Sequence, residues 1–187
     1  VDNLPLDYLD TLKALSKDKK CVAIGEIGLD YYWRQDNKEL QKKVFVEQIL
    51  LAKELNLPII VHSRDAHEDT LAILKEHKPK GVLHCFSGSV ETAKEILKLG
   101  MYIGLGGAVT FKNAKKPVEV AEFLPLDRLL LETDCPYMAP VPMRGKRNDS
   151  SYIPYVAEKI GEVKGMDPQE VIDAATENTK RLFELYL

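Results

Sequence analysis

The stretch that decides the fold is Pro58-Ile59-Ile60-Val61-His62, an apolar run that ends on a histidine. It shows no alternation of polar and apolar side chains, which is typical of a strand covered on both faces in a parallel sheet. Similar runs occupy residues 21–27, 81–86, 101–105 and 128–132. The sequence therefore predicts five short buried strands.

Helical patterns separate most of these predicted strands. Apolar residues recur at helical spacing between the first two strands, at Leu40, Val44, Ile49, Ala52 and Leu55. Ser89 is placed to cap a helix that Gly100 ends, and Asp167 followed by Pro168 is a start signal for a helix near the C-terminus. Strands alternating with helices predict an α/β fold with right-handed crossovers and a parallel sheet.

Length and composition indicate one globular domain over residues 1–187, with a formal net charge of −3 and 45% hydrophobic residues. The chain is short for a complete (β/α)8 barrel, which takes about 250 residues. No apolar run is long enough to cross a membrane, and the first residues do not resemble a secretory signal. The three cysteines are widely spaced, so we expect reduced thiols and a cytoplasmic protein.

Groups that can bind metal or transfer protons stand at the ends of four predicted strands: Glu26, His62, His84 and Asp134. The C-terminal ends of parallel strands meet at one mouth of an α/β barrel, where active sites lie. Two imidazoles and two carboxylates suit a divalent transition metal, and a carboxylate can bridge two ions that clamp a substrate. Any one of these residues alone is more simply a cap or a loop residue, but the set predicts metal ligands.

At these residues the sequence resembles the TatD family of metal-dependent deoxyribonucleases, in the amidohydrolase superfamily. The matching motifs are AIGEIGLDYY at 23–32, VHSRDA at 61–66, HCFSGS at 84–89, ETDCPY at 132–137 and NTKRLF at 178–183. The resemblance implies a TIM-type (β/α)8 barrel and two divalent ions, of zinc, manganese, magnesium, iron or nickel. It implies that Glu26 bridges the ions, that His62 and His84 bind one, and that Asp134 binds the other and acts as general base. The implied reaction is phosphodiester hydrolysis, typically exonucleolytic on DNA.

The sequence departs from the family pattern in its histidines. The family opens with a His-x-His pair on its first strand, whereas the histidines here are His62, His67, His77 and His84. The first motif matches the fourth strand of the family, so we expect these residues to form the last five β/α units of a barrel, with the first three missing. Such a piece would hold one ion weakly and be nearly inactive.

Substrate contacts are predicted on two basic segments and one aromatic segment. Arg64 could hold a phosphate or form an ion pair within its loop, and both alternatives stay open. The segment with Arg144, Lys146 and Arg147 is either a phosphate-binding loop or a solvated surface loop. Tyr31, Tyr32 and Trp33 follow Glu26 and could stack on bases, or pack in the core under the loop.

Three further residues have more ordinary interpretations. Glu132 shares strand parity with Asp134 and is interpreted as a supporting or structural group. His67 lies near the mouth as a less favoured ligand or substrate contact, and Asn178 is interpreted as the cap of a short last helix.

Three functions compete. The leading one is a metal-dependent nuclease whose partner is DNA or another phosphodiester. The same ligands would also serve an amidohydrolase or esterase acting on C–N or C–O bonds, including aminoacyl esters of tRNA, because polarising a carbonyl oxygen needs similar metal chemistry. The third is a non-catalytic remnant, if the His-x-His pair is absent from the gene. The sequence does not give the oligomeric state.

Overall fold

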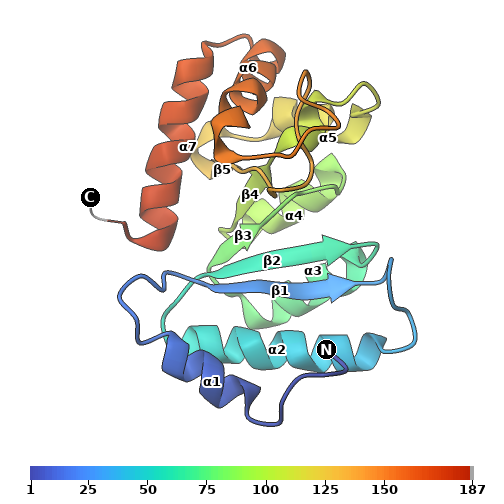
Figure 1. The fold of residues 1–187 in the computed structure, drawn as a ribbon, viewed down its shortest axis with the longest axis vertical. Helices are drawn as coiled ribbons and strands as arrows, with labels where there is room; N and C mark the ends of the chain where they lie inside the picture. The colour runs from blue at the N-terminus through green and yellow to red at the C-terminus, as the bar shows by residue number, and fades with distance from the viewer. Residues whose placement is uncertain (186–187) are drawn as a thin grey trace.

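The computed structural model describes residues 1–185 and is built around one parallel sheet whose strands lie in chain order (Figure 1). The five strands are β1 (Ile24–Asp30), β2 (Ile59–Arg64), β3 (Gly81–Leu83), β4 (Tyr102–Leu105) and β5 (Leu129–Leu131). The α/β class and the five parallel strands are confirmed. The sheet is open, with β1 and β5 at its edges. That three further units precede it stays a prediction.

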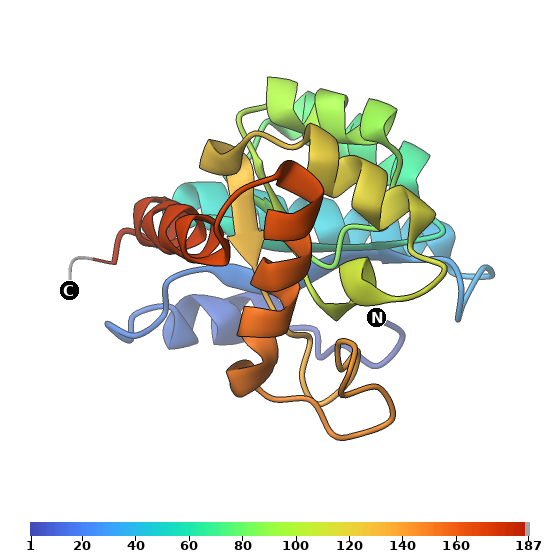
Figure 2. The same ribbon diagram turned by 90° about the horizontal axis from the view of Figure 1, so that it is seen from above.

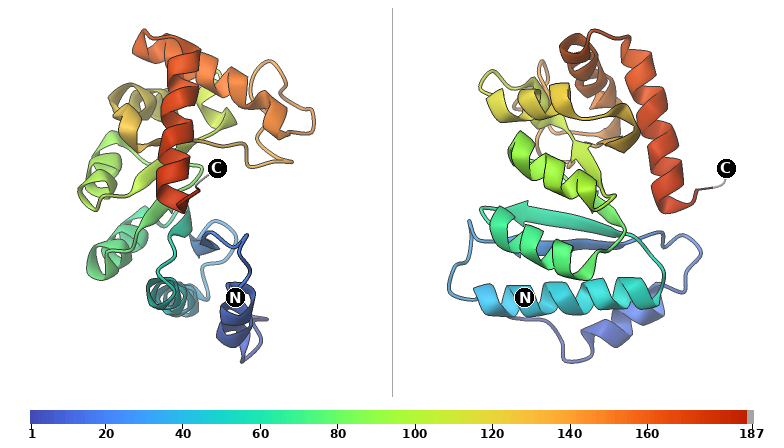
Figure 3. Two further views of the ribbon diagram at one scale, coloured as in Figure 1. Left: turned by 90° about the vertical axis from the view of Figure 1, so that its left-hand side faces the viewer. Right: turned by 180° about the vertical axis from the view of Figure 1, so that it is seen from behind.

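Helices connect the strands and cover one face of the sheet (Figures 1 and 3). The connecting helices are α2 (Lys38–Glu54), α3 (His67–His77), α4 (Val90–Lys98) and α5 (Lys115–Phe123). Helix α1 (Tyr8–Leu15) packs on α2, while α6 (Ile153–Lys164) and α7 (Pro168–Phe183) follow β5 and contact each other (Figure 2). Within residues 1–185, none of the helices has the length and apolarity to cross a membrane.

The predicted helix caps are confirmed. The Ser89 hydroxyl accepts the Thr92 amide N–H at 3.3 Å, and Gly100 follows α4 with a φ of +76°. The Asp167 carboxylate accepts the Gln169 amide N–H at 2.7 Å at the start of α7. Each helix end therefore gains a partner for a backbone group that the helix itself leaves free.

Every strand differs from its predicted range by one to three residues at one end or both, and β2, β4 and β5 span residues 59–64, 102–105 and 129–131. Strand β1 begins at Ile24 rather than at residue 21 and continues to Asp30. Strand β3 ends at Leu83 rather than at residue 86, because Cys85 has a φ of +43° and takes the chain out of the extended conformation. The structure also contains two helices that the sequence analysis does not predict, α1 and α6.

Alternate residues of each strand serve two different faces. On β2, Ile59 and Val61 are fully buried in the main core against the helices, whereas Ile60 joins a smaller cluster on the opposite face. That cluster contains Val82, Tyr102, Leu130 and Leu182, with Ile60 and Phe183 against it. His62 has the parity of Ile60, so the same face is apolar near the start of the strands and polar near their C-terminal ends.

Asn178 does not cap a helix, so that prediction is wrong. It lies inside α7 with 2% of its surface exposed, and its side-chain amide donates to the carbonyls of Leu126 at 2.6 Å and Leu129 at 2.9 Å. Asn178 therefore ties α7 to the start of β5.

Replacing this amide should destabilise the fold. Asn178→Ala takes the side-chain donor from the buried Leu129 carbonyl and one of two donors from the Leu126 carbonyl, so we expect the free energy of unfolding to fall by about 1–3 kcal/mol. Glu177→Ala, at the exposed neighbouring position, should change it by less than about 1 kcal/mol, because it removes only a surface ion pair with Lys180. Urea unfolding measures both values, and equal losses would contradict the role of Asn178.

Candidate metal centre

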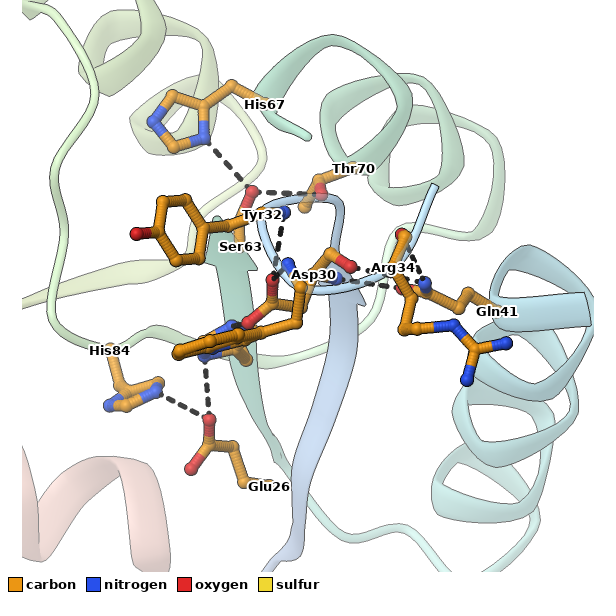
Figure 4. Close-up of polar contacts among 11 residues, drawn as sticks. Glu26, Asp30, Tyr32, Arg34, Gln41, Ser63, His67, Thr70 and His84 are labelled. Carbon is orange, nitrogen blue, oxygen red and sulfur yellow. Dashed lines mark hydrogen bonds and ion pairs between the residues drawn. The ribbon is translucent and has the colours of Figure 1, made fainter. Parts of the chain in front are cut away.

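Three of the four predicted ligands meet at the C-terminal edge of the sheet (Figure 4). Glu26 comes from β1, His62 from β2 and His84 from the turn after β3. His62 Nδ1 lies 2.8 Å and His84 Nε2 lies 2.9 Å from the same Glu26 oxygen, Oε1. One ligand atom from each residue falls within 4.8 Å of the others, so the three could hold one ion.

Gly28 allows β1 to pass close to β2 at this point. Its register partner on β2 is His62. Gly28 has a φ of +143°, and a Cβ there would lie 2.0 Å from the His62 carbonyl oxygen. Only glycine tolerates both the backbone angle and the close approach. The spacing of Glu26 and His62 therefore depends on this glycine.

Each histidine also has a carboxylate near its other ring nitrogen. His62 Nε2 lies 3.0 Å from Asp30 Oδ2, and His84 Nδ1 lies 3.8 Å from Glu132 Oε2. A carboxylate behind a histidine fixes the orientation of the ring and raises its basicity as a ligand. Sequence reasoning missed Asp30, although Asp30 shares strand parity with Glu26 and Gly28 once β1 is extended to its true end.

Glu132 sits beneath the centre. Its carboxylate accepts the backbone N–H of Cys85. Gly104 makes room for it, because a Cβ there would lie 2.6 Å from Glu132 Oε2. Burial raises the pKa of Glu132, although the nearby His84 acts against that rise. Its position agrees with the supporting role expected from the sequence.

Asp134 lies beside this group of three ligands, on the β5 side of the sheet. It is exposed, has a φ of +55°, and offers a ligand atom within 4.8 Å of those of His84 and Cys85 rather than Glu26. A cavity of about 320 Å³ is lined by all four predicted ligands together with Arg64. The structure thus gathers the four, but as one close group of three with Asp134 beside His84.

The charges at the centre are coupled. Hydrogen bonds from His62 and His84 hold the pKa of Glu26 far below its usual range. The bond to Glu26 raises the pKa of His62, and Asp30 adds to the rise against the effect of burial. Burial lowers the pKa of His84, but Glu26 and the charges of Glu132 and Asp134 outweigh it, so the net shift is upward.

This donor set fits a divalent transition metal. Two imidazole nitrogens and one carboxylate oxygen are a common ligand set for zinc, manganese, iron or nickel. Without a cation, the Glu26 carboxylate favours the protonated form of both histidines, which raises their pKa values. A bound cation would take the place of these protons, with His62 and His84 in their neutral form.

The predicted substrate residues lie around the cavity. Arg64 has no ion pair or hydrogen bond from its side chain within residues 1–185, so the loop ion pair considered above is not found there. Its guanidinium instead lies 3.9 Å from the centroid of the Tyr32 ring. His67 is not part of the close group and its Nδ1 lies 3.0 Å from the Ser63 hydroxyl (Figure 4).

The basic segment is anchored beside Asp134. Arg144, Lys146 and Arg147 are exposed, and Arg144 stacks 3.8 Å from the centroid of Phe111. The next residue, Asn148, is 2% exposed and donates from its side chain to the carbonyls of Thr133 at 2.7 Å and Tyr137 at 2.6 Å. This link holds the three cations on the same side of the sheet as Asp134.

Metal affinity should depend on pH through the two histidines. Because their pKa values are raised above 6.5, protons compete with a metal ion at and above that pH, while Glu26 stays ionised. We expect affinity for Zn²⁺ or Mn²⁺ to increase from about pH 5 to pH 8. Calorimetry in buffers of different ionisation enthalpy would count the protons released.

Asp30→Asn tests the cause of this dependence. The amide removes the charge that helps to raise the pKa of His62, so the rise in affinity should begin at lower pH. Asp36→Asn, at an exposed position paired with Arg34, should behave as the native protein. Affinity that stays constant over this pH range would show that the histidines do not bind the metal.

Comparison with known proteins adds to this geometry. The model of the family described as TatD related DNase matches residues 2–184. The uncharacterized metal-dependent hydrolase YabD of Bacillus subtilis is 53% identical, over 97% of this chain and 75% of its own length. The 3'-5' ssDNA/RNA exonuclease TatD of Erwinia tasmaniensis is 37% identical, over 94% and 71%.

A solved structure agrees with the fold. The crystal structure of YjjV, a TatD homologue from Escherichia coli, superposes with a TM-score of 0.90 at 36% identity. The match covers 99% of this chain and 73% of that one.

Proposed function

Because the chain belongs to the TatD family of metal-dependent hydrolases, we propose that it hydrolyses phosphodiester bonds of nucleic acid, as a deoxyribonuclease of the 3'-5' exonuclease type. The sheet and its helices match the TIM-type barrels of that family. The observation that carries the proposal is the cavity that Glu26, His62, His84 and Asp134 line together with Arg64.

The residues of the cavity divide the chemistry among them. Glu26, His62 and His84 would hold one divalent ion, and Glu26 with Asp134 would contribute to a second. When bound, such ions lower the pKa of water and polarise a phosphoryl oxygen. Asp134 is exposed to the cavity and would accept the proton of the attacking water. Asp30 keeps the His62 ring in place, because it lies at the nitrogen that faces away from Glu26.

The surrounding charges favour a phosphate over a carbonyl substrate. Arg64 presents guanidinium donors at the cavity wall, and Arg144, Lys146 and Arg147 extend positive charge along the β5 side. Phosphate oxygens accept hydrogen bonds from guanidinium and ammonium groups. The affinity for single-stranded nucleic acid rises with each phosphate that a cation contacts. A small amide or ester would use the metal ligands but would make no contact with Arg64 or the basic segment.

The central test is loss of the shared carboxylate. Glu26→Gln removes the charge that both histidines meet, so we expect turnover to fall by more than the roughly 10- to 100-fold typical of residues that only support a ligand. Full-length protein is assayed on labelled single- and double-stranded DNA with each metal in turn, and on an aminoacyl ester. Glu119→Gln, exposed on α5, is the control. Retained turnover in Glu26→Gln, or activity confined to the ester, would refute the proposal.

The basic segment gives a second test. Serine at Arg144, Lys146 and Arg147 together should raise KM for DNA with little change in kcat, because these residues hold phosphates rather than react. The dependence of log affinity on log salt should become shallower by up to about 2, at roughly 0.7 for each lost contact. Serine at Lys17, Lys19 and Lys20 removes equal charge before the start of β1. Equal effects of the two triple variants would contradict specific phosphate binding by Arg144, Lys146 and Arg147.

A further inference from the structure

Two large aromatic side chains project into solvent beside the candidate metal centre. Trp33 is 71% exposed and Tyr32 is 54% exposed, and their rings meet edge to face with centroids 4.9 Å apart. The preceding residue behaves differently, since Tyr31 is 6% exposed and its hydroxyl donates to Asp69 at 2.7 Å. Of the three predicted aromatics, one is core and two form an exposed pair, which we call the aromatic turn.

The aromatic turn is fixed by hydrogen bonds to its backbone. Asp30 Oδ1 accepts the amide N–H groups of Tyr32 at 3.0 Å and Trp33 at 3.2 Å. Buried Gln41 donates to the carbonyls of Asp30 at 3.1 Å and Arg34 at 3.2 Å (Figure 4). The backbone of the turn that carries the rings is thus held in place, so binding a flat ligand would require little further ordering of the turn.

Trp33 shares a second cavity, beside the one described above, with two of the metal ligands. Trp33 lines a cavity of about 410 Å³ together with Glu26 and His62. Asp30 joins the two features directly, because its other carboxylate oxygen, Oδ2, lies 3.0 Å from His62 Nε2. A group resting on Trp33 would therefore be next to the reacting end of a substrate.

Arg64 adds positive charge to the aromatic turn. Its guanidinium lies 3.9 Å from the Tyr32 centroid and 5.7 Å from the Trp33 centroid. A guanidinium stacked by its face keeps the N–H donors at its edge available for a phosphate. The combination of exposed rings with such a cation is the one that binds unpaired bases and their backbone in single strands.

We propose that Tyr32, Trp33 and Arg64 form a subsite for one unpaired nucleobase and its adjoining phosphate. The proposal rests on the proposed function and deepens it, since a base within a duplex has both faces covered by its neighbours and cannot use the subsite. Trp33 stacks the base in the 410 Å³ cavity, and Arg64, which lines the 320 Å³ cavity together with Asp134, binds the phosphate.

Oligonucleotides lacking a single base test the subsite. Full-length protein in EDTA, which prevents hydrolysis, is titrated with labelled single strands that carry one abasic residue at successive positions from the 3' end. We expect one position at which base removal weakens binding by about tenfold. Trp33→Leu should weaken binding of the intact strand by a similar factor and become insensitive to that position, and Trp33→Phe should restore most of the affinity.

Phe123→Leu is the matched control. Phe123 is also exposed and also lies under a cation, Lys94, but at the end of α5 away from the metal ligands. In Phe123→Leu, affinity should depend on the position of the abasic residue as it does in the native protein. The same native dependence in Trp33→Leu, in protein that still cleaves DNA, would overturn the subsite alone. Failure of the native protein to bind or cleave any strand would overturn the proposed function and the subsite with it.

Discussion

Two imidazole nitrogens meet one oxygen of Glu26, and the rest of the site is arranged around that contact. The three side chains come from three neighbouring strands, so their meeting depends on the register of the sheet. A slip of one residue on β2 would turn His62 toward the helices and Val61 toward the cavity. The complete burial of Ile59 and Val61 against the helices opposes such a slip. Hydrophobic packing on one face of the sheet therefore fixes the position of the metal ligands on the other face.

Negative charge is in excess around the two histidines. Glu26, Asp30, Glu132 and Asp134 all lie at the C-terminal edge of the sheet, and the first three contact or face an imidazole. The nearby carboxylates favour the protonated form of both rings, so the pKa values of His62 and His84 are raised. A divalent cation would offset this charge while both rings are neutral, and it would accept the lone pairs of the ring nitrogens. The arrangement thus favours cation binding as the pH rises and the rings lose their protons, and opposes it in acid.

Sequence reasoning succeeded where a signal is local and failed where the partners are distant. The change from an apolar run to a histidine or acid marks Glu26, His62 and His84 without any three-dimensional information. Asp30 was missed because β1 was ended at Ile27, three residues too early. The partners of Asn178 are carbonyls about fifty positions away, so its sequence context suggested a cap instead. The anchoring role of Asn148 was not predicted either, since no local pattern shows that its amide would hold the basic segment to the carbonyls of Thr133 and Tyr137.

The order of strands sets how a nucleic acid would cross the site under the proposed function. The aromatic turn follows β1, Arg64 ends β2, and the segment with Arg144, Lys146 and Arg147 follows β5. Along the sheet edge the rings therefore lie on the β1 side, Arg64 stacks on Tyr32 at the end of β2, and the other cations lie on the β5 side. A single strand can turn a base toward the rings while its phosphates continue along the cations, because its bases are free to unstack. A duplex keeps its bases inside and presents phosphates on both strands, so it could engage the cations but not the rings. The distribution of side chains along the sheet edge thus favours an unpaired end as the substrate, with Glu26 between the base and the next phosphate.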